Sequence, residues 1–310
     1  MGVFVFLPLV LPLTAWPVAR LAEQRLHPST ATRLLTAFAG VLAVCSTLCL
    51  GLLMIVGTAQ LPGNPLPDGW SDPEVRAALP YDEIAGRAAI PALLAVLVSC
   101  GRAAWRHVQV RRRALAALAG LPVTSVAVLP DPEPYAYALP GRRDRVVAST
   151  GMLAGLTSAE RRALFAHERA HLNARHHRHL LVVHLAARAN PFLRPLTTAV
   201  TYTAERWADE EAAAVTGSRR TVARAIGKAA LISRGGPAAA TLPALAAAGP
   251  VPRRVAALLR PAPAGRAWPS AFTTVGLAVW GAAAGATVSA LSSANSAVTL
   301  FAILRAATPM

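Results

Sequence analysis

Long apolar runs with few or no charges occupy both ends of the chain and divide it into regions. Residues 1–19 and 34–58 contain no charged side chain, and a third apolar run, about 84–103, contains only Arg87 and Arg102, near its two ends. About 20 consecutive apolar residues are enough to cross the hydrocarbon core of a bilayer. The pattern therefore predicts an N-terminal membrane region, residues 1–103, with three spans.

A fourth apolar run, 267–304, contains no charged residue and predicts a C-terminal membrane region over residues 267–310. We expect one span at about 271–290. The run is too long for one ordinary span and barely long enough for two, and the polar stretch 292–296 offers a break. The sequence leaves one span and two spans both open.

The segment between these regions, residues 104–266, mixes apolar and charged positions and predicts a water-facing domain. Runs rich in β-branched residues predict strands at 123–129 and 145–150, with a further strand at 135–139 after a proline-rich turn. An edge strand of such a sheet can pair with an extended peptide by strand addition, and a purely structural sheet is the alternative.

The rest of this domain predicts helices. One helix is expected to run from Ser158 to a turn at Asn190, and a later helix is ended by Gly217. Two more are expected at about 220–233 and 252–259, the second of them short and basic.

Charges in the loops predict how the chain is oriented. The loop 20–33 has three arginines against Glu23, whereas the loop 59–83 has five acidic residues against Arg76. Cytoplasmic loops carry an excess of Lys and Arg. We therefore expect the loop 59–83 outside the cell and the domain 104–266 in the cytoplasm.

Composition agrees with a membrane protein and argues against other classes. Hydrophobic residues make up 54%, charged residues only 15%, and the mean hydropathy is +0.44. A net charge of +16 suggests nucleic-acid binding, but the arginines flank apolar segments and no nucleic-acid motif is present, so the expected partner is the bilayer. Cys45, Cys49 and Cys100 lie in apolar runs and predict no disulfide framework.

The residues that point to chemistry form an HExxH pattern, with His167, Glu168 and His171. Residues four apart on a helix share a face, so the two imidazoles can bind one metal ion. Glu168 lies about 100° further round the helix, where it can reach water beside the ion. Thr157 and Glu160 fit a capping box that starts this helix.

A catalytic zinc site needs three protein ligands and an open position. Glu205 is the candidate third ligand, and Asp209 lies four residues later on the same helix face, where it can accept a hydrogen bond from a ligand imidazole. The pattern predicts Zn²⁺ held by His167, His171 and Glu205. The alternatives are a surface helix with incidental histidines and a solvated acidic face, since two more glutamates follow Asp209.

HExxH followed by E-x-x-A-D-x-x-A, which starts at Glu205, resembles the membrane zinc metallopeptidases of the BlaR/MecR antirepressor type and their HtpX and CAAX-prenyl-protease relatives. The similarity covers about 126–259. It implies a mainly α membrane protein, a multi-span helical bundle with a zincin-like α+β metallopeptidase domain that carries a small β-sheet.

The same resemblance implies roles for single residues. His167, His171 and Glu205 would be metal ligands, Glu168 the general base, and Asp209 a support for a ligand. The family often has an aspartate five residues after the second histidine, whereas this chain has His176 there. A contact that the aspartate makes in the family is therefore in doubt for this chain. Candidates for stabilising an oxyanion, none of them preferred, are His176, His177, Tyr202 and Arg206.

The implied activity is a zinc metalloendopeptidase of the gluzincin type in a bacterial cell membrane, acting on protein or peptide substrates. Cleavage of a cytoplasmic transcriptional repressor is the most typical role, and HtpX-like quality control is the alternative. A penicillin-sensing S-x-x-K motif is absent, because Lys228 is the only lysine and Ala225 stands three residues before it. A non-catalytic zinc-containing sensor or scaffold also stays open, although Glu168, which is not needed to hold metal, argues against it.

Overall fold

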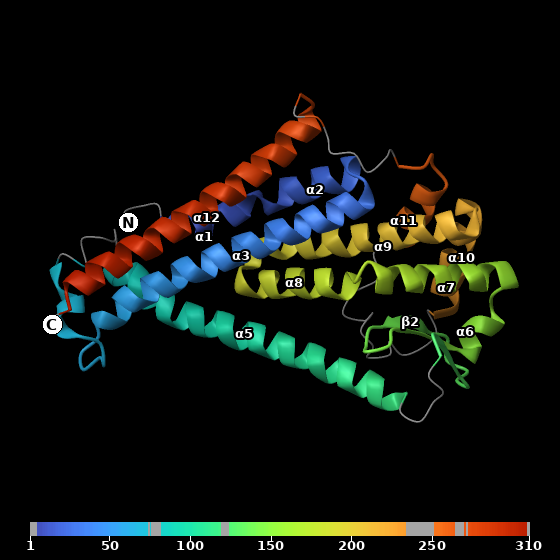
Figure 1. Cartoon of the computed structure of the whole chain (residues 1–310), viewed down its shortest axis with the longest axis horizontal. Helices are drawn as coiled ribbons and strands as arrows, with labels where there is room; N and C mark the ends of the chain where they lie inside the picture. The colour runs from blue at the N-terminus through green and yellow to red at the C-terminus, as the bar shows by residue number, and fades with distance from the viewer. Residues whose placement is uncertain are drawn as a thin grey trace.

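The computed structural model shows a bundle of long helices with a small β-sheet at one end (Figure 1). It describes residues 5–73, 75, 82–118, 124–233, 251–263, 270 and 272–308, with only the backbone at 82 and 83.

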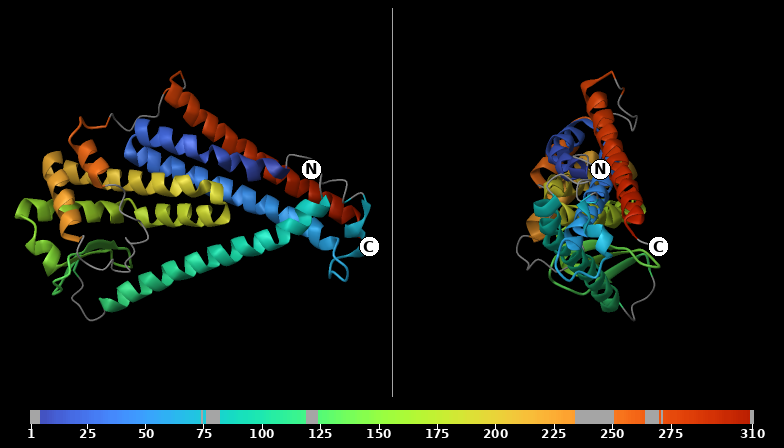
Figure 2. Two further views of the ribbon diagram at one scale, coloured as in Figure 1. Left: turned by 180° about the vertical axis from the view of Figure 1, so that it is seen from behind. Right: turned by 90° about the vertical axis from the view of Figure 1, so that its left-hand side faces the viewer.

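Three helices of the described chain are long and apolar enough to cross a membrane: α3 (Pro28–Ala59), α5 (Asp82–Ala117) and α12 (Thr274–Ala306). α3 lies between the other two and contacts both (Figure 2). The expected spans 34–58 and 84–103 fall within α3 and α5. The uncharged run near the C-terminus forms the single helix α12, which continues through the polar stretch 292–296.

The region expected as the first span is broken into short segments. α1 (Leu7–Val10), the 3-10 helix η2 (Leu11–Thr14) and α2 (Ala15–Arg25) follow one another. Pro8 and Pro12 lie near the starts of α1 and η2, where their missing N–H groups interrupt a continuous helix.

These segments nevertheless run along the bundle. Val5 packs in the cluster that contains Val56 and Leu304, near the ends of α3 and α12, whereas Ala22 packs in the cluster with Leu35 near the start of α3. Residues 5–25 therefore follow α3 for about 30 Å, given a rise of about 1.5 Å per helical residue.

The sheet has three strands in the order β1-β3-β2: β1 (Val126–Leu129), β2 (Ala136–Leu139) and β3 (Arg145–Ser149). β1 is parallel and β2 antiparallel to β3, so β2 forms an edge. All three strands fall within the runs predicted from the sequence, although residue 123 lies outside the described residues. Leu139 and Val147 pack on one face of the sheet with Leu118 at the end of α5.

Seven further helical segments complete the domain: α6 (Thr150–Ala154), α7 (Ser158–Asn173), α8 (His176–Ala189), η4 (Pro191–Leu193), α9 (Arg194–Thr216), α10 (Arg219–Ile232) and α11 (Val251–Leu258). The helix expected from Ser158 to Asn190 is in fact two helices, since Arg175 has a φ of 53° and separates α7 from α8. Gly217, with a φ of 68°, ends α9 as predicted. The alanine- and proline-rich segment between the expected helices 220–233 and 252–259 predicts a connector, and residues 234–250 lie outside the described residues.

α8 and α9 both pack against the membrane-length helix α3. Leu196 and Val200 of α9 are buried with Leu35 and Leu42 of α3. Thr32 Oγ1 of α3 donates a hydrogen bond to Thr203 Oγ1 of α9 at 3.0 Å. The side chains that follow on α9 are therefore positioned by direct packing on the membrane-length helix α3.

Candidate metal centre

α7 begins where the sequence predicts and is anchored there. Thr157 caps the helix, with its backbone N–H donating to Glu160 Oε2 at 3.0 Å. Lys228 Nζ of α10 donates to the same carboxylate oxygen at 2.8 Å. Further along, the alanines at 163 and 166 are buried with those at 212 and 213 of α9, and such small side chains let the two helices approach closely.

This approach brings together His167 and His171 of α7 with Glu205 of α9, whose ligand atoms all lie within 4.8 Å of one another. The two Nε2 atoms are 3.1 Å apart. His167 Nε2 and His171 Nε2 are each 3.5 Å from an oxygen of Glu205.

These distances suit a small tetrahedral ion. With bonds of about 2.0–2.1 Å, as zinc forms to nitrogen and oxygen, the ligand atoms of a tetrahedron lie about 3.3–3.4 Å apart. Two imidazoles and a carboxylate are also a ligand set that zinc accepts. The three residues can therefore hold a metal ion.

A buried ion-pair network contacts His167 and Glu205 on the side away from the candidate metal position and orients both side chains. His167 Nδ1 is 3.0 Å from Asp209 Oδ1, and Asp209 is fully buried. Arg254 of α11 donates to both Asp209 oxygens, at 2.6 and 2.9 Å, and its Nη1 is 2.7 Å from Glu205 Oε2. The guanidinium thus fixes Glu205 and Asp209 together and neutralises part of their charge.

Glu168 lies beside the group, on the side of the sheet. Within the sheet, Ser149 N–H donates to Tyr135 O at 2.9 Å, so the backbone groups of Ala136 and Ala138 point to the free edge of β2. The backbone of Ala138 lies near enough to Glu168 to favour the ionised carboxylate and so to lower its pKa, against the larger effect of burial. The open edge of β2 therefore faces the metal centre.

His176 stands at the position where the resembling family often has aspartate, and its ring contacts His171. Its Nδ1 is 2.8 Å from His171 Nδ1. The left-handed backbone at Arg175 turns the chain so that His176, 1% exposed, returns over His171. Its ring packs edge-on against Trp207, with centroids 4.8 Å apart.

The environment shifts the pKa of each group. Burial opposes protonation of His167, but the carboxylates of Asp209 and Glu205 outweigh burial and raise the pKa of His167 to about 10. Burial lowers the pKa of His171 to about 4. Burial raises the pKa of Glu168, although the residue keeps part of its surface exposed. For Glu205 burial acts in the same direction, but Arg254 and the histidines hold its pKa well below the ordinary value.

The candidates for oxyanion stabilisation other than His176 make contacts elsewhere. Arg206 Nη2 is 3.2 Å from Glu210 Oε1. Tyr202 is buried, with Arg253 4.1 Å above its ring. His177 is half-buried near Arg178 and Arg111, and its pKa is lowered to about 4, first by burial and then by these charges.

Comparison with known proteins supports a function class for this centre. Residues 101–189 match the family model for peptidase family M48. This match supports an M48 metallopeptidase. The matched region ends before Glu205, which the structure brings to the two histidines of the M48 segment. No curated protein and no solved structure matches the chain.

Proposed function

We propose that the chain is a membrane-embedded zinc endopeptidase that hydrolyses peptide bonds of protein substrates at a cytoplasm-facing site. The observation that carries the proposal is the convergence of His167, His171 and Glu205 within 4.8 Å, with Glu168 beside them. The M48 match over residues 101–189 and three membrane-length helices support it.

In this proposal His167, His171 and Glu205 hold the zinc ion. When bound, zinc supplies Lewis acidity that activates water and polarises the scissile carbonyl. Glu168 accepts a proton from the attacking water and returns it to the leaving amine. Asp209 holds the ring of His167 in the tautomer that presents Nε2 to the ion.

The edge of β2 would position the substrate. An extended peptide can add to this edge as a strand, because the backbone groups of Ala136 and Ala138 are directed away from β3. The scissile bond would then lie next to Glu168. Main-chain pairing of this kind accepts many sequences, as a protein substrate requires.

The bilayer and a protein substrate are the proposed partners, and the charge pattern of the loops supports a cytoplasmic site in a bacterial cell membrane. Within this activity, regulated cleavage of a cytoplasmic transcriptional repressor is one role and HtpX-like quality control of membrane proteins is the other. The second function class is a non-catalytic sensor that keeps the zinc fold.

Glu168→Gln separates enzyme from sensor. The variant keeps size and shape but cannot take up the proton, so zinc should stay bound while hydrolysis falls by about 10²–10⁴-fold. His171→Ala should lose zinc and activity together, because too few ligands remain. The assay is turnover of a casein-type substrate in detergent, with metal analysis of each variant. Unchanged hydrolysis in Glu168→Gln would refute catalysis at this centre.

A further inference from the structure

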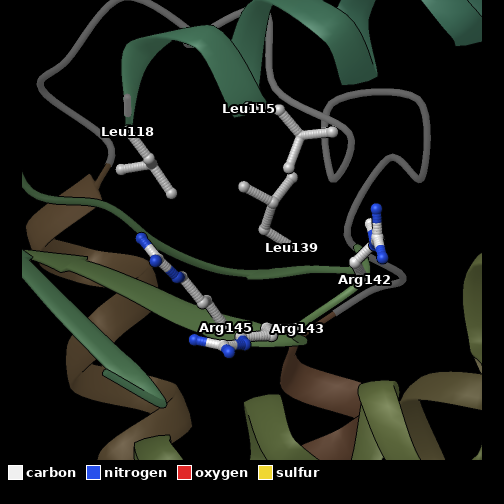
Figure 3. A pocket seen from close by; sticks show the side chains of 6 residues that line it. All are labelled: Leu115, Leu118, Leu139, Arg142, Arg143 and Arg145. Carbon is white, nitrogen blue, oxygen red and sulfur yellow. The ribbon is translucent and has the colours of Figure 1, made fainter. Parts of the chain in front are cut away.

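A pocket of about 650 Å³ lies on the face of the sheet opposite α7, beside the end of β2. It is lined by Leu115, Leu118, Leu139, Arg142, Arg143 and Arg145. Figure 3 shows Leu115 and Leu118 reaching from α5 toward Leu139, while the three arginines come from the β2–β3 hairpin. We call it the arginine pocket. One wall is apolar and the rim is cationic.

No described acidic side chain neutralises the cationic rim. Among the described residues, no ion pair involves Arg142, Arg143 or Arg145. Asp144 is the only acidic residue within the hairpin, and its Oδ1 accepts the backbone N–H of Gly141 at 3.0 Å. The segment that follows Leu118, residues 119–123, contains no acidic residue. Guanidinium groups that have no anionic partner favour a carboxylate or phosphate ligand.

The pocket is placed to read a substrate that pairs with β2. Leu139 ends this strand, and Arg145 is its partner on β3. Side chains of an added strand alternate between the two faces of the sheet, at about 3.3 Å per residue. A side chain that passes Leu139 on the α5 face therefore enters the arginine pocket. It belongs to a residue within about three positions of the peptide bond beside Ala138.

The distance from the membrane favours a peptide over a lipid headgroup. The apolar part of α5 ends at Arg102, and Leu115 lies thirteen residues further along the same helix, or about 20 Å. Headgroups extend only about 5–8 Å beyond the hydrocarbon core on each side. The arginine pocket thus stands in the aqueous phase beyond the headgroups.

We propose that the arginine pocket is a specificity site that selects substrates with an acidic side chain, flanked by an apolar one, close to the scissile bond. This inference rests on the proposed peptidase function, because a specificity site needs a substrate. Binding of an acidic extended peptide at the β2–β3 hairpin can still be measured without hydrolysis.

The test uses the full chain in detergent and a fluorescein-labelled peptide with Glu near its centre, together with versions that carry Gln or Lys there. Binding is measured by fluorescence anisotropy on the Glu168→Gln variant. Arg143→Glu combined with Arg145→Glu should weaken binding of the Glu peptide at least about tenfold, as expected for loss of charge-assisted contacts. The Lys peptide should then bind better than the Glu peptide.

Charge alone is controlled by replacing two exposed arginines of the remote helix α10, Arg220→Glu combined with Arg224→Glu, which changes net charge by the same amount. This variant should bind the Glu peptide as the parent does. If both double variants bind the Glu peptide equally weakly, or if the parent binds the Glu and Gln peptides equally well, the proposed specificity site is wrong. It is also wrong if binding to phosphatidylglycerol vesicles depends on Arg143 and Arg145 while the Glu peptide fails to bind. Thermal unfolding and zinc content of each variant show that it is folded.

The two proposals fail separately. If the Glu peptide binds as expected but the wild-type chain hydrolyses no substrate, the peptidase function fails and the pocket stands. If the chain hydrolyses Glu and Gln peptides with the same KM, the peptidase stands and the pocket fails.

Discussion

His176 occupies a buried site where its two ring nitrogens meet different neighbours. Nδ1 lies 2.8 Å from His171 Nδ1, and the ring edge packs on Trp207. If His171 presents Nε2 to a metal ion, its Nδ1 carries the hydrogen and donates it to His176. The Nε2–H of His176 is then buried without a hydrogen-bond partner among the described residues. A histidine in this tautomer orients His171 without adding the negative charge of an aspartate.

Removing this support should weaken metal binding. His176→Ala should lower zinc affinity about 10–100-fold, the usual effect of losing the partner of a ligand imidazole, whereas His176→Asp should keep most of it. Affinity is measured by competition with a chromophoric chelator. His179→Ala is the control, since His179 also lies near Trp207, at 6.5 Å between ring centroids, but is not in contact with His171. Wild-type affinity in His176→Ala would contradict a supporting role.

The sequence predicts parts of this site that follow from local geometry and misses others. His167 and His171 lie one helical turn apart, and Glu205 and Asp209 repeat that spacing, so periodicity alone pairs them. Arg254 is 45 residues beyond Asp209, and no spacing rule connects them. Only the packing of α11 on α9 buries its guanidinium between two carboxylates. The sequence predicted a short basic helix at about 252–259 but did not identify Arg254 as part of the site.

At the scale of elements, the break between α7 and α8 could not be read from the sequence. Neither Gly nor Pro occurs near Arg175, and arginine seldom takes a positive φ. Tertiary contacts of His176 with His171 and Trp207 hold the chain in that conformation. By contrast, Gly217 marked the end of α9 correctly, because glycine adopts the left-handed region without strain.

The start of α7 depends on Glu160, and this gives stability a pH dependence. A hydrogen bond from Lys228 and the capping contact with Thr157 lower the pKa of Glu160 to about 2. Since the folded-state pKa lies below the unfolded one, this stabilisation is complete above about pH 4.5 and is lost as the pH falls toward 2. Lys228→Met should lower the free energy of unfolding by about 0.5–1 kcal/mol at pH 7.

That difference should shrink as the pH falls, because protonated Glu160 no longer gains from the lysine. Denaturant unfolding in detergent at pH 7, 4 and 3 measures it. Arg224→Met, an exposed cation on the same helix, should show no comparable loss at any of these pH values. A Lys228→Met effect that stays constant with pH would contradict the ionic contact.

The crossing of α3 and α5 depends on a close backbone approach at Gly57 and Gly86. A Cβ on Gly57 would collide with the backbone of Gly86. Gly57→Ala should therefore destabilise the protein by about 1–3 kcal/mol, as overpacking does. Gly51→Ala on the same helix has open space around it and should be neutral or slightly stabilising. Thermal unfolding in detergent compares the two, and equal melting temperatures would refute a tight crossing.

At the scale of the whole molecule, α7, which carries two of the proposed metal ligands, and the loop that follows α3 lie toward opposite ends of the bundle (Figure 1). α3 starts near α9, which carries Glu205, and ends at Ala59 at the other end of the bundle. α5 then returns to the sheet. At the far end, Trp70 Nε1 donates to Thr308 Oγ1 at 3.0 Å, so the loop after α3 and the end of α12 meet. If α3, α5 and α12 each cross the membrane, this meeting point and the metal centre are on opposite sides.

The charges of the loops predict which end faces the cytoplasm, and the accessibility of single cysteines tests this prediction. In a chain whose Cys45, Cys49 and Cys100 are replaced by alanine, Ser71→Cys should react with a membrane-impermeant maleimide added to intact cells. Gln24→Cys and Arg112→Cys should react only after the membrane is opened, because arginine-rich loops stay in the cytoplasm. All three positions are exposed in the structure, so burial cannot explain a lack of labelling. Labelling of Arg112→Cys but not Ser71→Cys in intact cells would invert the orientation and move the metal centre, with any substrate, to the outside.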